Sequence, residues 1–181
     1  MPTAELIDHL KRHALRTDGP FTLRSGAVSS WYLDARQTTL DGEGASLVGR
    51  AVLEVLAPDV DAVGGMTMGA DPIAVATALT AALEGRPLRA FSVRKSPKMH
   101  GTGGRLVGPV DRGDRVAVIE DTTTTGAAAA EAVEHLTGEG IGVAQVIALV
   151  DRSQGVAERR FADLGVEFNA LVLPADLGVE E

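Results

Sequence analysis

The chain has 181 residues, the length of one domain, and 45% of them are apolar, so it can bury a core and is not a disordered chain. A formal charge of −8 argues against nucleic acid or anionic lipid as a partner, because each phosphate contact needs a cation. The absence of cysteine excludes disulfides and cysteine-based metal sites. Because no apolar segment follows the first methionine, we expect no signal peptide and no membrane span, and a single cytoplasmic domain over residues 1–181.

Apolar spacing predicts helices and strands that alternate along the chain. In chain order we expect a helix over 4–15, a hairpin with strands 21–23 and 28–33, a helix over 45–56, a strand over 60–63, a helix over 72–83, strands over 88–93 and 115–119, a helix over 126–136, a strand over 143–150, a helix over 154–164 and a strand over 167–173. The segment 116–119 is apolar on both faces, as buried parallel strands are. This order indicates an open α/β sheet, in which ligands bind beyond the carboxyl ends of the strands.

The strand over 115–119 runs directly into two acids, Glu120 and Asp121, then into four threonines, Gly126 and an alanine-rich helix. Free N–H groups at a helix start, threonine hydroxyls and a glycine together suit one phosphate group. The two acids would repel that phosphate, but they suit the hydroxyls of the sugar that carries it. A 5-phosphorylated ribose satisfies both halves of the motif. The alternative is a capped helix start beside two solvated acids.

The segment 116–127 resembles the phosphoribosyl diphosphate (PRPP) signature of type I phosphoribosyltransferases, with Glu120 where many members have Asp. The resemblance implies that family's fold: an open, mostly parallel sheet with flanking helices, a small N-terminal hood over about 1–40 and a flexible catalytic loop. It also implies that PRPP is bound by residues of this segment and the one after it, namely Glu120, Asp121, Thr122, Thr123, Thr124, Thr125, Gly126, Ala127 and Ala128.

Residues 91–110 contain no acid and hold two of the chain's three lysines, Lys95 and Lys98, among glycines and prolines. A flexible cationic loop of this kind suits a lid over a diphosphate. The alternative is a solvated basic surface loop.

The pattern Arg94-Lys95-x-x-Lys98-x-His100-Gly101 resembles the catalytic loop of the orotate phosphoribosyltransferase family. The resemblance implies a homodimer in which Lys95, Lys98 and His100 approach the diphosphate bound to the neighbouring subunit, while Arg94 stays with its own.

Three further stretches resemble the same family. Residues 21–34 resemble the hood, with Arg24 in place of a lysine, and Tyr32 and Leu33 at positions that flank the orotate ring. Residues 63–74 resemble the diphosphate loop, although many relatives carry a lysine before Pro-Ile-Ala and this chain has Gly69-Ala70-Asp71. In residues 150–155, Arg152 matches the residue that holds the orotate carboxylate. Taken alone, Trp31-Tyr32 would be a half-buried hairpin pair and Asp151-Arg152 a salt-bridged strand end.

The family's activity is transfer of the 5-phosphoribosyl group from PRPP to orotate, which yields orotidine 5′-monophosphate and diphosphate in pyrimidine biosynthesis. The implied catalytic residues are Lys98, His100, Asp121 and Glu120; the other implied contacts are Arg24, Arg94 and Lys95 to PRPP and Tyr32, Leu33, Thr124 and Arg152 to orotate. Mg²⁺ is expected to be held mainly by the substrate, with no protein cage. Two alternatives remain: a phosphoribosyltransferase for another base, and a PRPP-sensing regulator on the same fold.

His9 and His13 lie four residues apart on the predicted first helix and could ligate zinc. No third ligand accompanies them, so we expect both on a solvated helix face. His135 is expected to be equally unremarkable.

Overall fold

The computed structural model describes residues 4–22, 26, 28–97 and 104–180. Its centre is a six-stranded sheet with the strand order β10-β9-β8-β5-β6-β7. Neighbouring strands are parallel except that β7 runs antiparallel to β6 at one edge. The strands are β5 (Ala62–Met66), β6 (Arg89–Val93), β7 (Leu106–Val107), β8 (Arg115–Thr123), β9 (Gly142–Asp151) and β10 (Glu167–Val172).

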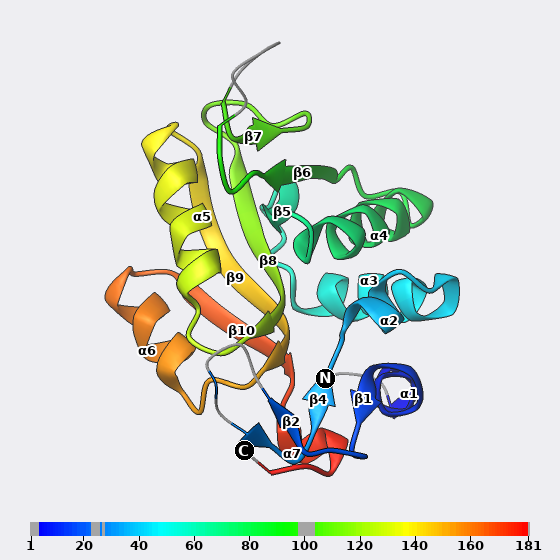
Figure 1. Cartoon of the computed structure of the whole chain (residues 1–181). Coiled ribbons are helices and arrows are strands. Elements are labelled where there is room, and N and C mark those ends of the chain that lie inside the picture. The colour runs from blue at the N-terminus through cyan, green and yellow to red at the C-terminus, as the bar shows by residue number, and fades with distance from the viewer. Residues whose placement is uncertain (1–3, 23–25, 27, 98–103, 181) are drawn as a thin grey trace.

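Helices cover both faces of this sheet (Figure 1). Helices α3 (Gly42–Val55) and α4 (Ala70–Leu83) lie on one face, and α5 (Ala127–Gly138) and α6 (Val156–Asp163) lie on the other. Side chains of β8 alternate between the two cores: Ala117 and Ile119 pack with α3 and α4, while Val116 and Val118 pack with α5 and α6. The predicted open sheet with a two-sided apolar strand is therefore confirmed.

Strand β8 extends four residues beyond its predicted end. Its partner β9 continues beside it, pairing Glu120 with Ala148 and Thr123 with Asp151. The two acids thus belong to the strand itself, and the polar end of the strand reaches the carboxyl edge of the sheet. The predicted helix boundaries agree with the structure to within a few residues, whereas the short helices α2 (Arg36–Thr39) and α7 (Pro174–Leu177) were not predicted.

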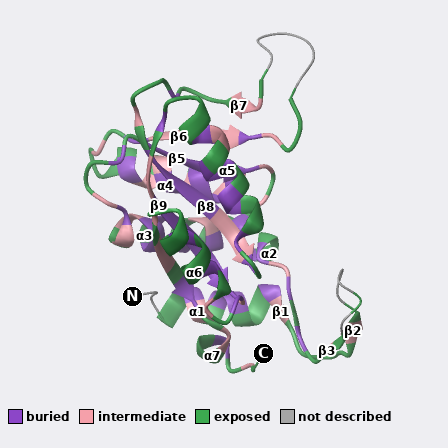
Figure 2. Cartoon of the chain, turned by 90° about the vertical axis from the view of Figure 1, so that its left-hand side faces the viewer, coloured by how far each residue is buried: buried purple, intermediate pink, exposed green. Residues whose placement is uncertain are grey.

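The predicted hairpin is confirmed, but its second strand is shorter than the predicted 28–33 because the structure divides this stretch at Trp31. Strand β3 (Val28–Ser29) pairs with β2 (Phe21–Thr22), and β4 (Tyr32–Leu33) pairs with β1 (Leu15–Arg16). At the division the Ser29 hydroxyl donates to the Trp31 carbonyl at 2.7 Å, and the indole of Trp31 is buried. The β2–β3 hairpin extends from the body of the molecule (Figure 2).

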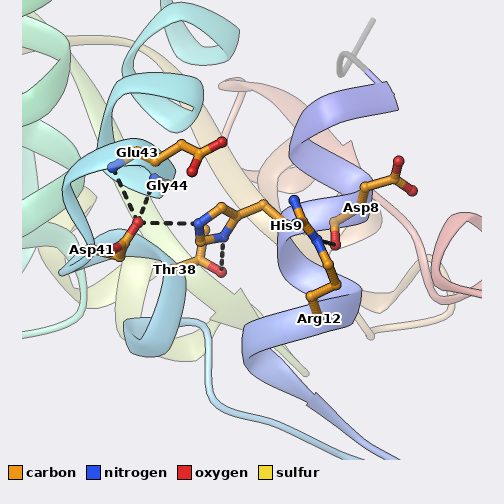
Figure 3. A network of polar contacts seen from close by, with 7 residues as sticks. All are labelled: Asp8, His9, Arg12, Thr38, Asp41, Glu43 and Gly44. Atoms are coloured by element: carbon orange, nitrogen blue, oxygen red, sulfur yellow. Dashed lines mark hydrogen bonds and ion pairs between the residues drawn. The ribbon is translucent and has the colours of Figure 1, made fainter.

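The expectation of a solvated face is wrong for His9, while His13 is exposed as predicted. Helix α1 (Ala4–His9), which continues as a π-helix over Leu10–Ala14, turns His9 toward α2 and α3. His9 is 1% exposed; Nδ1 lies 3.2 Å from the Thr38 hydroxyl and Nε2 lies 3.1 Å from Asp41 (Figure 3). The same Asp41 oxygen accepts from two backbone N–H groups at the start of α3. This network joins α1, α2 and α3.

No helix among the described residues is long and apolar enough to cross a membrane.

Candidate active site

A cavity of about 400 Å³ lies at the carboxyl edge of the sheet, where the strand-end motifs were expected to meet. Segments distant in sequence form it: β4 with the residues after it, the end of β5 with the turn after it, a residue just beyond β6, the end of β8 and the start of α5. The cavity is lined by Tyr32, Leu33, Asp34, Ala35, Arg36, Met66, Thr67, Met68, Gly69, Lys95, Glu120, Asp121, Thr122 and Ala128. Seven of the predicted site residues therefore share one cavity: Tyr32, Leu33, Lys95, Glu120, Asp121, Thr122 and Ala128.

The two acids of β8 lie in a poorly solvated part of this cavity. Burial, and next the neighbouring Asp121 carboxylate, raise the pKa of Glu120 to about 7. The Ala129 N–H and the positive charge of Lys95 partly oppose that rise. Burial also raises the pKa of Asp121, against a hydrogen bond of 2.8 Å from the Thr122 N–H to its carboxylate. Glu120 is thus poised near neutral pH, where it can both accept and donate a hydrogen bond.

The turn after β5 approaches Asp121 closely. A Cβ atom added to Gly69 would lie 2.6 Å from the carboxyl carbon of Asp121, so a side chain at position 69 would collide with it. In this chain the Asp121 carboxylate therefore fills the space beside Gly69.

Asp71 ties the same turn to strand β6. One carboxylate oxygen accepts from the Thr67 hydroxyl at 2.7 Å, and the other accepts from the Ser92 hydroxyl. The Thr67 N–H also donates to the Val93 carbonyl at 2.9 Å. Because both oxygens of Asp71 face these hydroxyls, its charge is partly satisfied beside a cavity expected to receive anions.

The threonine run forms the turn from β8 into α5. Thr123 is buried, and its hydroxyl accepts from the Gly126 N–H at 2.8 Å, which stabilises the turn. Gly126 has a φ of +70°, a conformation that favours glycine. Arg160 of α6 donates to the Thr125 carbonyl at 2.7 Å. Four further predicted residues of this stretch are exposed at the helix start: Thr124, Thr125, Ala127 and Ala128.

Within the acid-free segment 91–110, the described residue Lys95 lies at the first cavity. Lys95 is exposed and lines the cavity. The Arg94 N–H donates to the Arg105 carbonyl at 2.8 Å, and the Arg105 side chain donates through Nε to the Arg94 carbonyl at 2.6 Å. Arg105 in turn pairs with Glu131 of α5. Three other predicted site residues, Arg24, Lys98 and His100, lie outside the described residues.

Arg152 lines a different cavity, of about 490 Å³, together with residues of the C-terminal segment. Its N–H donates to the Thr123 carbonyl at 2.8 Å, so its backbone lies beside the threonine run. Its guanidinium lies over the ring of Trp31, with Cζ 3.7 Å from the ring centroid. Arg152 thus contacts the hood residue next to Tyr32 but does not line the first cavity.

The sequence analysis did not single out Asp34 and Arg36 as site residues. They form an ion pair at 2.7 Å in the wall of the first cavity, and the pKa of Asp34 is lowered by its hydrogen bond with Arg36. The signal that could have found them is their place directly after Tyr32-Leu33 in the hood motif. Among the described residues, no group of three or more His, Asp or Glu side chains is arranged to hold a metal ion.

The sheet order, the acids at the end of β8 and the glycine turn after β5 define a type I phosphoribosyltransferase fold. Comparison with known proteins agrees. The orotate phosphoribosyltransferase of Streptomyces avermitilis is 45% identical over 97% of this chain and 96% of its own length. The chain belongs to the orotate phosphoribosyltransferase family.

Solved structures give the same relationship. Orotate phosphoribosyltransferase of Mycobacterium tuberculosis H37Rv in complex with Fe(III) dicitrate has a TM-score of 0.86 and 40% identity, covering 97% of this chain and 98% of that one. The same enzyme in complex with PRPP has a TM-score of 0.82 and 37% identity over the same shares. No protein-family model matches the chain.

Proposed function

We propose that this protein is a single-domain cytoplasmic enzyme that transfers the 5-phosphoribosyl group of PRPP to orotate, giving orotidine 5′-monophosphate and diphosphate in pyrimidine biosynthesis. The observation that carries the proposal is the cavity in which the paired acids of β8, the glycine turn and Lys95 meet, in a chain of this family. In the reaction the bond from the ribose anomeric carbon to the diphosphate oxygen breaks, a bond from that carbon to a ring nitrogen of orotate forms, and the proton of that nitrogen passes to the departing diphosphate or to solvent.

The acids of β8 are proposed to hold the ribose. Glu120 and Asp121 would accept hydrogen bonds from the two ribose hydroxyls, with Asp121 near the positive charge that develops on the sugar as the anomeric bond breaks. Thr122 to Ala128 would hold the 5′-phosphate at the start of α5, supported by exposed Thr124 and Thr125 at the turn.

Cations are proposed to stabilise the departing diphosphate. Lys98 would neutralise its charge, and His100 would bind it or donate a proton. Lys95, at the cavity wall, and Arg94 and Arg24 would contribute further contacts to PRPP. Tyr32, Leu33, Thr124 and Arg152 would contact orotate, with the planar guanidinium of Arg152 suited to its carboxylate.

Mg²⁺ fits the donor set of the cavity, because Glu120 and Asp121 offer the carboxylate oxygens that this ion prefers. When bound with PRPP it would supply charge stabilisation of the diphosphate. We expect substrate oxygens to provide most of its ligands, with the two acids placed nearby.

A homodimer with a shared loop is also proposed, and the outer face of α4 supports it. Val75, Leu79 and Leu83 follow one another every four residues and are 60%, 60% and 81% exposed, and residues 72–83 carry no charge. Helix α4 begins at the turn that lines the cavity, so a second copy on this stripe would stand beside the cavity that its loop must reach.

Leu79→Glu should yield a monomer in sedimentation experiments; an unchanged dimer would place the interface elsewhere.

The decisive assay follows orotate absorbance in the presence of PRPP and Mg²⁺. Loss of absorbance with orotate, and no product with uracil or purines, supports the proposal. Turnover of another base would favour a different phosphoribosyltransferase, and PRPP binding without turnover of any base would favour a regulator. The acidic chain gives no reason to expect nucleic acid or a membrane as a partner.

A further inference from the structure

Trp31, the chain's one tryptophan, joins three parts of the molecule. It lies between β3 and β4 in the hood and is 2% exposed. Its indole N–H donates to the Glu180 carbonyl of the C-terminal segment at 2.9 Å. Its ring lies under the guanidinium of Arg152, whose Cζ is 3.7 Å from the ring centroid. Hood, C-terminal segment and the end of β9 therefore meet at one side chain.

The stack restricts the direction in which Arg152 can present its donors. The hydrogen bond to Thr123 fixes the Arg152 backbone at the sheet edge, while the ring of Trp31 supports the flat face of the guanidinium. A guanidinium makes its two parallel hydrogen bonds to a carboxylate in its own plane, through its edge. The stack therefore restricts rotation of the Arg152 side chain and is compatible with in-plane hydrogen bonds made through the edge of its guanidinium.

We propose that Trp31 is a positioning residue for substrate recognition: its ring orients Arg152 toward the carboxylate of orotate. The inference rests on the proposed function, in which Arg152 contacts orotate. It extends the recognition site to the C-terminal segment, since Arg152 shares its cavity with Leu173, Pro174, Ala175, Val179 and Glu180.

A merely structural role for Trp31 would have a different signature. Loss of a buried ring lowers the free energy of unfolding and with it the amount of active enzyme. The apparent kcat then falls, while KM for orotate and KM for PRPP show no selective change. Loss of an Arg152 support weakens orotate binding in particular and leaves the PRPP site, built from β8 and the turn after β5, unchanged.

The test compares Trp31→Leu with Trp31→Phe in steady-state kinetics for both substrates. We expect Trp31→Leu to raise KM for orotate about tenfold while KM for PRPP stays within about twofold. Trp31→Phe keeps a stacking face and loses only the N–H to Glu180, so its KM for orotate should stay within about threefold of wild type. An equal rise in both KM values, or a rise in the Phe variant as large as in the Leu variant, would overturn the inference.

Phe168→Leu is the matched control, because Phe168 stacks on Phe161 in the opposite core, with ring centroids 5.3 Å apart. It should destabilise the fold while leaving KM for orotate unchanged. If the wild-type enzyme fails to consume orotate, the proposed function falls and this inference falls with it. The inference alone is overturned by a different result: the wild type is active and Arg152→Ala raises KM for orotate, but Trp31→Leu does not.

Discussion

Gly69 lies against the carboxylate of Asp121, so closely that a Cβ at position 69 would be 2.6 Å from one of its oxygens. The turn after β5 and the end of β8 are therefore fitted to one another at the point where sugar and diphosphate are proposed to bind. The contact lies in the segment before Pro-Ile-Ala, where this chain departs from the family pattern by carrying Gly69-Ala70-Asp71.

Gly69→Ala should lower kcat/KM for PRPP by about 10- to 100-fold, because the new methyl group must displace either the Asp121 carboxylate or the turn, and small misplacements at a reacting centre are costly. Steady-state kinetics measure the change. The control is Gly138→Ala at the end of α5, where an added Cβ meets nothing within 4 Å. Equal activity of the two variants would show that the Gly69–Asp121 fit is unimportant for turnover.

Glu120→Gln should stabilise the protein at pH 8 and have little effect at pH 4.5. The pKa of Glu120 is raised to about 7 in the folded state, so the folded protein holds this proton more tightly than the unfolded chain. The resulting penalty is absent below the unfolded pKa, grows as the pH rises and is complete above about 7. A shift of this size corresponds to roughly 3 kcal/mol. Urea unfolding of both proteins at the two pH values measures it.

Glu134→Gln is a suitable control for that experiment, because Glu134 is an exposed acid on α5. Its effect on the free energy of unfolding should be small at both pH values. If Glu120→Gln gives the same difference from wild type at pH 4.5 and pH 8, the raised pKa is not a property of the folded protein.

Local sequence patterns predicted the sheet and its helices well, because β8 and its neighbours are apolar on both faces and the helices are regularly spaced. They failed where contacts between residues distant in sequence determine the local structure and burial. Trp31 sits in a stretch that alternates like one strand, but its contacts with Arg152 and Glu180 come from residues more than 100 positions away. His9 shows the same limit, since its partner Thr38 lies on α2 and its partner Asp41 is the N-cap of α3.

The site was predictable to the extent that a strand end carries its own chemistry. Glu120 and Asp121 indicate a polar strand end in the sequence, and Lys95 comes just after β6. The parallel sheet therefore brings these three residues into one cavity. The distance between Arg152 and that cavity depends on how the hood folds over the sheet edge, which no local spacing encodes. The same holds for the raised pKa of Glu120, because it arises from burial by several segments.

His9→Leu should destabilise the protein by about 2 kcal/mol without changing KM for either substrate. The substitution keeps the buried volume roughly filled but leaves the Thr38 hydroxyl and one Asp41 contact without their partner. Thermal or urea unfolding measures the loss. His13→Leu is the control: His13 is exposed one turn further along and its ring centroid lies 4.4 Å from that of His9, so this variant loses a ring contact and keeps both hydrogen bonds of His9. Equal stability of the two variants would mean that the network in Figure 3 contributes little to joining the helices.

Mixed dimers test whether the loop acts across subunits. Lys98→Ala should reduce turnover strongly and leave the fold intact, because it removes charge stabilisation of the leaving diphosphate, and Asp121→Ala should reduce it by disturbing the ribose site. A heterodimer that combines the two variants contains one site with neither defect if the loop of one subunit serves the other. We therefore expect purified heterodimers, assayed by loss of orotate absorbance, to recover up to about half of the wild-type activity. Heterodimers as inactive as the parents, or a Lys98→Ala enzyme with wild-type kcat, would exclude a shared catalytic loop.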